Sequence, residues 1–257
     1  MRSNIGTIEL NYLVNGESDL PWLVFSNSVA TDLTMWDEQV EQLKSRFQIL
    51  RYDQRGHGLS DAPPGKYSID MFAEDLVNLL DTLGIRRASL VGISMGGMTV
   101  LTLAKKHPAR VDKLVVCDCG PASNPGAAQQ WMDRIDKVTA GGMGTIVEET
   151  IGRWFTKETL ENDSPILDRV ATMIRNTPVS GFAGSAHALA DFDLRPGLER
   201  LSVPTLFIAG EHDAVIGGTR ILSETAPNSR FEMIPRAGHL CNLENSPDFL
   251  STLREFL

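Results

Sequence analysis

The chain has 257 residues, enough for one large domain or two small ones with a sizeable hydrophobic core. Hydrophobic residues make up 42% of it and charged residues 22%, and no uninterrupted apolar run approaches the ~20 residues of a membrane span, which excludes disordered and membrane-spanning chains. The formal net charge of −9 repels phosphate backbones and disfavours nucleic acid as a partner. Residues 1–6 lack the apolar stretch of a secretory signal, so we expect a cytoplasmic protein.

The first part of the chain shows strand and helix patterns in alternation. Apolar and polar side chains alternate over residues 8–14, which predicts a strand, and Asn15-Gly16 after it is typical of a hairpin turn. Apolar runs, typical of parallel strands buried on both faces, follow at 22–25, 47–52, 88–92 and 114–117. Helical spacing of apolar residues predicts helices over 70–83 and 96–106. Together they predict right-handed crossovers and a mostly parallel sheet with helices on both faces.

The strand pattern disappears between residues 121 and 198, where helical stretches such as 131–138 and 146–155 take its place. Beyond this block, strands are expected at 204–209 and 231–234, and helices at 218–225 and 248–257. We therefore predict an α/β fold with a doubly wound sheet, whose core domain comprises residues 1–120 and 199–257. Residues 121–198 are predicted to form a helical cap, or lid, inserted between the two halves and placed over the carboxyl edge of the sheet.

The pentapeptide Gly92-Ile93-Ser94-Met95-Gly96 lies between a predicted buried strand and a predicted helix. In that context it has the pattern of a nucleophile elbow, where a tight strand-to-helix reversal holds a serine in a strained backbone conformation. Small residues at Gly92 and Gly96 let the backbone pass. We therefore predict that the Oγ of Ser94 stands exposed above the sheet as a nucleophile.

A serine hydroxyl is a poor nucleophile at neutral pH unless a base removes its proton, so the elbow predicts a histidine and a carboxylate later in the chain. Asp213 and His239 each follow one of the last two expected strands, and His239 lies in a glycine-led loop. The order Ser94, Asp213, His239 is the order that this kind of fold uses. Glu211 and Asp118 stay as alternative acids, Asp118 because it too directly follows a strand.

Acyl transfer also requires hydrogen-bond donors aimed at the developing oxyanion. One follows from the elbow: the backbone N–H of Met95 at the start of the helix, where the helix dipole also favours negative charge. The second is expected from the loop after the strand at 22–25. We assign it to the N–H of Val29, with Ser28 and Ala30 as the neighbouring alternatives.

Other chemically reactive residues are assigned no catalytic role. The remaining histidines are expected in packing, turn or solvent positions, because none follows a late strand in a glycine-led loop: His57, His107, His187 and His212. The three cysteines form no CxxC pair, so we predict neither a disulfide framework nor a metal site. Cys117 and Cys119 are expected to pack in the core.

Several motifs together resemble the α/β-hydrolase superfamily over essentially the whole chain: Trp36 after the first apolar strand and its loop, Arg51 to Ser60, Gly92 to Gly97, Gly210 to Asp213, and Gly238-His239. Within it, the chain resembles the 3-oxoadipate enol-lactonases of bacterial aromatic catabolism most. That resemblance lies in Ser26-Asn27-Ser28, Thr31-Asp32, Met35-Trp36, Arg153-Trp154-Phe155, Ala190-Asp191, Asp193-Leu194-Arg195, and His239-Leu240 with Asn242 and Glu244. The chain departs from the lactonase pattern at Val29-Ala30, Gln54 and Cys241, where Leu-Gly, Thr and Ser are usual.

The resemblance implies hydrolysis of a five-membered enol-lactone with a carboxymethyl arm, through an acyl-enzyme on Ser94, to give a keto acid. No metal or organic cofactor is required, because Ser94, His239 and the backbone donors supply every step. A substrate carboxylate favours a guanidinium partner, which we assign to Arg153, beside Trp154 in the cap. Further cap residues considered for the pocket lining are Trp131, Phe182 and His187.

Alternative functions stay open. A carboxylesterase on short acyl esters would use the same residues with a less polar pocket, and a cofactor-free perhydrolase is conceivable because methionine follows the nucleophile in such enzymes too. A third alternative is a ligand receptor on the hydrolase fold, which would bind stoichiometrically and survive Ser94→Ala, whereas an enzyme turns over. The expected partner is a small-molecule lactone or ester, and the sequence does not determine the oligomeric state.

Overall fold

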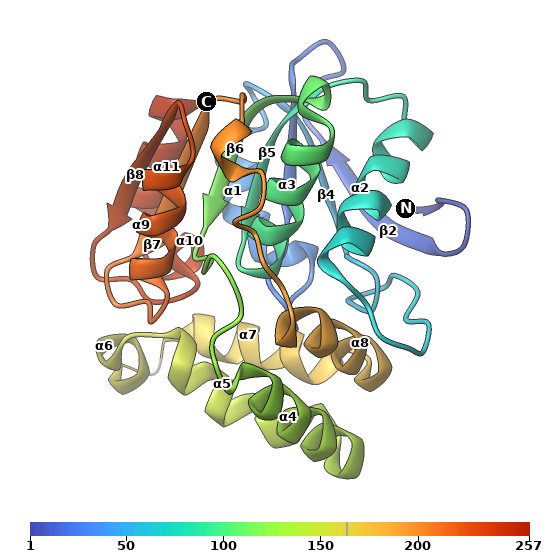
Figure 1. Ribbon diagram of the computed structural model, residues 1–257, viewed down its shortest axis with the longest axis vertical. Coiled ribbons are helices and arrows are strands. Elements are labelled where there is room, and N and C mark those ends of the chain that lie inside the picture. The colour runs from blue at the N-terminus through green and yellow to red at the C-terminus, as the bar shows by residue number, and fades with distance from the viewer. Residues whose placement is uncertain (163) are drawn as a thin grey trace.

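The computed structural model describes residues 1–162 and 164–257 of the chain. Its centre is an eight-stranded sheet with the strand order β1-β2-β4-β3-β5-β6-β7-β8 (Figure 1). The strands are β1 (Arg2–Asn4), β2 (Glu9–Asn15), β3 (Trp22–Ser26), β4 (Gln48–Tyr52), β5 (Ala88–Ile93), β6 (Val111–Cys117), β7 (Thr205–Gly210) and β8 (Ser229–Ile234). From β4 to β8 all neighbouring strands are parallel, so the predicted mostly parallel α/β sheet is confirmed.

The turn at Asn15-Gly16 does not form the predicted hairpin. β2 pairs antiparallel with β1, a strand that the sequence pattern did not reveal, and with β4, while β3 lies beyond β4. β3 is apolar along most of its length, and its place between β4 and β5 buries it on both faces. A place beside the half-exposed β2 would leave part of that apolar surface in water, so the hairpin prediction was wrong for this physical reason.

Helices cover both faces of the sheet. Those of the core are α1 (Asp37–Leu43), α2 (Ile69–Thr82), α3 (Met95–Lys106), α9 (Ile216–Thr225), α10 (Cys241–Glu244) and α11 (Ser246–Phe256). α2 packs against α3, and α1 packs against α11 (Figure 1). The start of α2 follows from its sequence, because the side chain of Ser68 accepts a hydrogen bond from the N–H of Met71 and caps the first turn.

Between β6 and β7 the chain forms helices: α4 (Ala127–Gly141), α5 (Val147–Trp154), α6 (Lys157–Glu161), α7 (Pro165–Asn176) and α8 (Val179–Ala190). Figure 1 shows them grouped at one end of the sheet. In the described part of residues 121–198, the β-structure is one isolated bridge between Ala122 and Asp193. Below, "cap" denotes residues 121–198, and the predicted boundary between cap and core stays a proposal.

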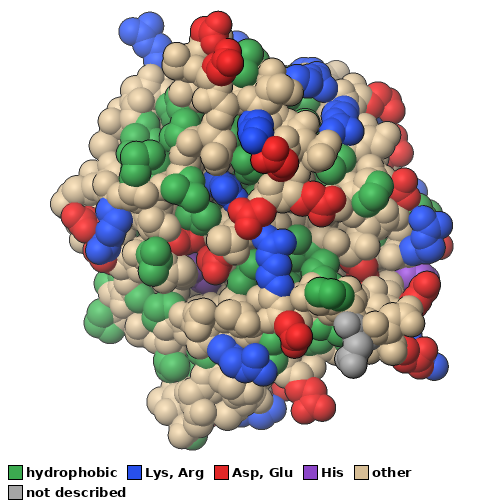
Figure 2. Space-filling model, turned by 180° about the vertical axis from the view of Figure 1, so that it is seen from behind, with side chains coloured by type: hydrophobic (Ala, Val, Ile, Leu, Met, Phe, Trp, Pro, Cys, Tyr) green, Lys and Arg blue, Asp and Glu red, His purple; other side chains and the backbone are tan. Residues whose placement is uncertain are grey.

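The surface carries charges of both signs. On the face that Figure 2 shows, basic and acidic side chains are interspersed rather than separated into two regions. None of the described helices is both long enough and apolar enough to cross a membrane. Over the described residues, no three His, Cys, Asp or Glu side chains are grouped so that they could hold a metal ion.

Candidate active site

Ser94 stands on a sharp turn between β5 and α3. Its backbone has a φ of 54° and a ψ of −121°, a strained conformation for a residue with a side chain. The local sequence makes this turn possible: a Cβ on Gly92 would clash with the carbonyl oxygen of Gly96, and one on Gly96 would clash with that of Ser26. The N–H of Ser94 is fixed by a 2.8 Å hydrogen bond to the carbonyl oxygen of Cys117.

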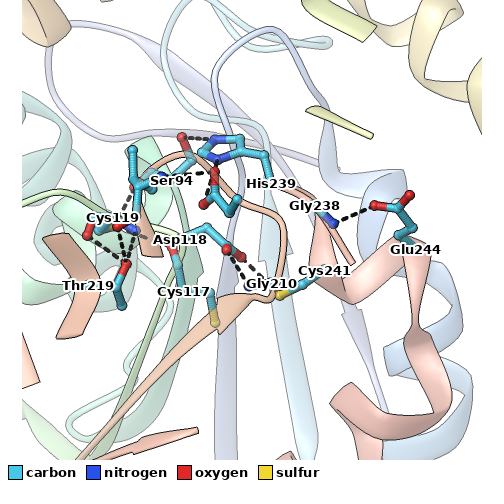
Figure 3. Close-up of polar contacts among 12 residues, drawn as sticks. Ser94, Cys117, Asp118, Cys119, Gly210, Thr219, Gly238, His239, Cys241 and Glu244 are labelled. Carbon is cyan, nitrogen blue, oxygen red and sulfur yellow. Dashed lines mark hydrogen bonds and ion pairs between the residues drawn. The ribbon is translucent and has the colours of Figure 1, made fainter. Parts of the chain in front are cut away.

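The structure brings Ser94, His239 and Asp213 together. The Nε2 atom of His239 lies 2.9 Å from the Oγ of Ser94 (Figure 3). On the other side of the ring, Nδ1 lies 3.1 Å from each carboxylate oxygen of Asp213. If Nδ1–H donates to Asp213, the lone pair on Nε2 is free to accept the serine proton. The geometry therefore matches a nucleophile, a base and an orienting acid, and these catalytic roles stay predictions.

The ionisation state of Asp213 depends on two opposing effects, burial and its contacts. Burial by itself would raise the pKa of its carboxyl, but the interaction with His239, together with hydrogen bonds from Asp118 and Val215, outweighs burial and holds the pKa below its ordinary value. Asp213 is therefore ionised at neutral pH. A carboxylate in this position stabilises the imidazolium that forms when His239 takes up a proton.

The two alternative acids lie elsewhere. The carboxylate of Glu211 accepts a hydrogen bond from the N–H of Arg236 at 2.9 Å and is partly exposed to solvent. Asp118 is fully buried, and its carboxyl accepts the N–H of Gly210 at 2.8 Å. Neither carboxyl is hydrogen-bonded to a nitrogen of His239 within the described part of the chain.

The two predicted oxyanion donors are both placed near Ser94. Met95 is the first residue of α3, and Val29 lines the same cavity as Ser94 and His239. Among residues 1–162 and 164–257, neither backbone N–H has a hydrogen-bond acceptor. Ala30 has a φ of 56°, so the loop turns sharply directly after Val29. The two N–H groups are thus available to a ligand, and their assignment as oxyanion donors stays a prediction.

A cavity of about 390 Å³ opens above Ser94. Its cap lining includes both residues that the sequence assigned to substrate, Arg153 and Trp154, and also Trp131. Phe182 is absent from the described lining because it is fully buried behind Trp131, with 6.2 Å between the ring centroids. His187 is likewise outside the described lining.

Arg134 also lines this cavity, although no motif in the sequence pointed to it. Its guanidinium lies 5.0 Å from the ring centroid of Trp131 and donates a 2.6 Å hydrogen bond to the Oγ1 of Thr150. Arg134 is only 9% exposed, and in the described structure its Nε has no partner. Burial, with the nearby charge of Arg153, lowers the pKa of Arg134 to about 10. One sequence signal could have indicated Arg134: it follows Trp131 by three residues on α4, so both side chains lie on one face of the helix.

The end of α5 is tied to the loop that carries His239. The ring of Trp154 is stacked on the imidazole of His239, with 5.9 Å between centroids, and its carbonyl oxygen accepts the His239 N–H at 2.7 Å. Glu244 accepts the N–H of Gly238 at 2.6 Å, as Figure 3 shows, and the N–H and hydroxyl of Thr156 at 2.8 and 2.7 Å. Cap and histidine loop are therefore held in one hydrogen-bonded unit.

The sequence matches the family model described as alpha/beta hydrolase fold over residues 21–246. It is 36% identical to 3-oxoadipate enol-lactonase 2 of Acinetobacter baylyi over 94% of this chain and 90% of that protein. It is 29% identical to a protein of Stutzerimonas stutzeri provisionally named carbamate hydrolase RutD, over 96% of both chains. The crystal structure of the enol-lactonase from Burkholderia xenovorans superposes with a TM-score of 0.95 at 34% identity, covering 100% of this chain and 99% of that one.

Proposed function

The chain belongs to the α/β-hydrolase-fold family and is a hydrolase, and from this premise we propose that it opens a carboxylate-bearing enol-lactone. The proposed reaction converts 3-oxoadipate enol-lactone to 3-oxoadipate through an acyl-enzyme on Ser94, in the catabolism of aromatic compounds. One observation carries the proposal. The cavity above Ser94 is lined by two arginines, Arg134 and Arg153, that form no ion pair in the described structure, and a substrate without a negative charge would leave both without a counter-charge.

In the first half-reaction, the Oγ of Ser94 attacks the lactone carbonyl while the Nε2 of His239 takes the serine proton. The N–H groups of Val29 and Met95 donate to the oxyanion of the tetrahedral intermediate. Its collapse breaks the ring C–O bond and expels an enolate, which takes the proton from His239 and becomes a ketone. Because the ketone is a much weaker nucleophile than the enolate, ring closure is disfavoured.

In the second half-reaction, water replaces the serine as the attacking group. His239 removes a proton from the water, whose oxygen adds to the acyl carbon on Ser94. The second intermediate collapses when the Ser94 oxygen leaves and takes the proton back from His239. The product is a keto acid with a new carboxylate, and the net consumption is one water per lactone.

The carboxymethyl arm of the substrate is proposed to pair with the cap guanidiniums. Arg134 lines the cavity, is mostly buried and forms no ion pair in the described structure, so a substrate carboxylate would supply the counter-charge of its guanidinium. Arg153 is exposed and adds a second positive charge at the cavity wall. The relatives named enol-lactonases support this choice of substrate, and the relative named as a carbamate hydrolase marks the competing one.

The proposal is tested by comparing kcat/KM over a substrate panel. The panel contains the enol-lactone, generated in place from muconolactone by its isomerase, the same lactone with its arm methylated, a short p-nitrophenyl ester and a simple carbamate. We expect the charged lactone to be turned over fastest, by about 100-fold over the methylated one, as expected for loss of a charge-assisted contact.

The other outcomes separate the alternatives. Cleavage of the p-nitrophenyl ester with no loss of the lactone would indicate a carboxylesterase, and preference for the carbamate would indicate a carbamate hydrolase. Binding of one lactone per chain without turnover, unchanged in Ser94→Ala, would indicate a receptor. Each of these results would refute the lactonase proposal.

A further inference from the structure

Asp118 is a buried carboxyl that the proposed mechanism does not use. It directly follows β6, is 1% exposed and has a φ of 51°, which is uncommon for a residue with a side chain. Its Oδ1 accepts the N–H of Gly210 at 2.8 Å, and its Oδ2 lies 2.9 Å from the Sγ of Cys241 (Figure 3). Burying a carboxyl is unfavourable unless polar partners compensate for the lost water. The partners of Asp118 therefore indicate which parts of the site it connects.

These contacts join the two loops that carry the partners of Ser94. Gly210 is the last residue of β7, three positions before Asp213. Cys241 is the first residue of α10, two positions after His239. The side chain of Asp118 thus holds the acid loop and the histidine loop at a fixed separation.

The carboxyl of Asp118 also lies near that of Asp213: both residues line the cavity above Ser94, and each carboxyl shifts the pKa of the other. Two ionised carboxylates in a buried contact repel each other, so the pair is stable only if one carries a proton and donates it to the other. Asp213 is bound to His239, and that contact keeps it ionised. The proton therefore resides on Asp118, and burial and the charge of Asp213 both raise the pKa of Asp118.

The other titratable groups around Asp118 are thiols. Cys241 contacts its carboxyl, and Cys117 and Cys119 flank it in sequence. Burial raises the pKa of each thiol well above its ordinary value, so all three are neutral. None of them supplies a positive charge that would favour ionisation of Asp118.

We propose that Asp118 is a positioning residue: it stays protonated, donates a hydrogen bond to Asp213 and holds that carboxylate in line with His239. This role rests on the functions proposed above for Ser94, Asp213 and His239, and it does not depend on which substrate the enzyme hydrolyses. Asp118 touches no reacting atom and acts only through Asp213.

The test compares Asp118→Asn with Asp118→Ala. Asparagine has the same shape, is neutral at every pH, can accept the Gly210 N–H and can donate an amide hydrogen to Asp213. We expect kcat of Asp118→Asn within about threefold of the native chain, and kcat of Asp118→Ala lower by about 10- to 100-fold with KM nearly unchanged, the range for loss of one hydrogen bond to a charged group. Glu211→Gln, which changes an acid outside these contacts, is the matched control and should leave kcat unchanged.

The protonation state is read from an NMR titration of the His239 imidazole, which needs no turnover. If Asp118 is neutral, its replacement by asparagine leaves the titration midpoint within about 0.3 pH units of the native value. If Asp118 is ionised, the same change removes a negative charge near the imidazolium and lowers the midpoint by about one pH unit, which would overturn the proposal.

The two experiments also distinguish this proposal from the proposed function. A native chain that hydrolyses no lactone or ester refutes the function, while the titration still decides the state of Asp118. Equal kcat in Asp118→Ala and the native chain overturns the positioning role. Should Asp118→Ala fail to fold, Asp118→Asn decides alone: kcat about 10-fold or more below the native value, or a lowered midpoint, rejects the proposal.

Discussion

Replacing Arg134 by methionine removes the buried guanidinium from the cavity and keeps a flexible apolar side chain against Trp131 and Phe182. The size of the effect follows from the electrostatics of the site. The pKa of Arg134 is lowered to about 10, first by burial and then by Arg153, and this is more than two pH units below the ordinary value of arginine. At 1.36 kcal/mol per unit, burial places an unfavourable free energy on the order of 3 kcal/mol on the charged guanidinium.

A substrate carboxylate offsets that unfavourable free energy and forms charge-assisted hydrogen bonds worth about 1.5–3 kcal/mol each. We therefore expect Arg134→Met to lower kcat/KM for the carboxylate-bearing lactone by about 100-fold, since 1.4 kcal/mol corresponds to a factor of ten. The methylated lactone, which lacks the charge, should change by less than about threefold. Arg153→Met should cost less than about fivefold on either substrate, because an exposed charge is screened by water and salt.

The assay measures kcat/KM for both lactones with the native chain and the two variants, after thermal unfolding has shown that each variant is folded. An equal loss on the charged and the methylated lactone would show that Arg134 only supports the cap. A larger loss at Arg153 than at Arg134 would refute the reasoning from burial and favour the residue that the sequence assigned.

Glu244→Ala removes the bond between the cap and the His239 loop. Compared with Glu244→Gln, it should lower kcat by about tenfold and speed hydrogen exchange at the amide of Thr156. Unchanged exchange would contradict this prediction. Burial lowers the pKa of His57 from its ordinary value of 6.5 to about 4. Between these two pH values, His57 binds a proton in the unfolded chain but not in the folded chain. The native chain should therefore lose about 3 kcal/mol of unfolding free energy between about pH 6.5 and pH 4, and His57→Gln should lose less; equal slopes in denaturant titrations would refute the assignment. Ala30→Gly should raise the unfolding free energy by up to about 1 kcal/mol, because glycine adopts the positive φ at this position without strain; a lower melting temperature would contradict it.

The sheet could be predicted because its strands have strong local signals. The runs at 88–92 and 204–209 are apolar throughout, and the structure buries every residue of β5 and β7. β1 could not be predicted, since three residues with no apolar alternation give no pattern. The prediction of a hairpin after residues 8–14 was wrong. A turn signal indicates that the chain reverses, but it does not determine which strand pairs with β2, and that strand is β4.

In the candidate site too, features encoded by a local sequence pattern could be predicted, and features that depend on long-range packing could not. The strained turn at Ser94 could be predicted because it is encoded within five consecutive residues, and the positions of Asp213 and His239 after the last two strands could be predicted from the order of the strands. Arg134 was not found, because the burial of a helical arginine depends on packing that its own segment does not encode. Glu244 was part of the lactonase resemblance, but its contact with Thr156 was not predicted, because Thr156 lies 88 residues earlier in the chain.

The central claim is that Ser94 opens a carboxylate-bearing enol-lactone through an acyl-enzyme. Its most direct test follows the loss of the enol-lactone absorbance with the native chain and with Ser94→Ala, and measures the intact protein mass after rapid acid quenching. We expect fast loss with the native chain, none above background with Ser94→Ala, and an adduct of the substrate mass on the native chain alone. Undiminished turnover in Ser94→Ala, or a lactone untouched by the native chain, would contradict the claim.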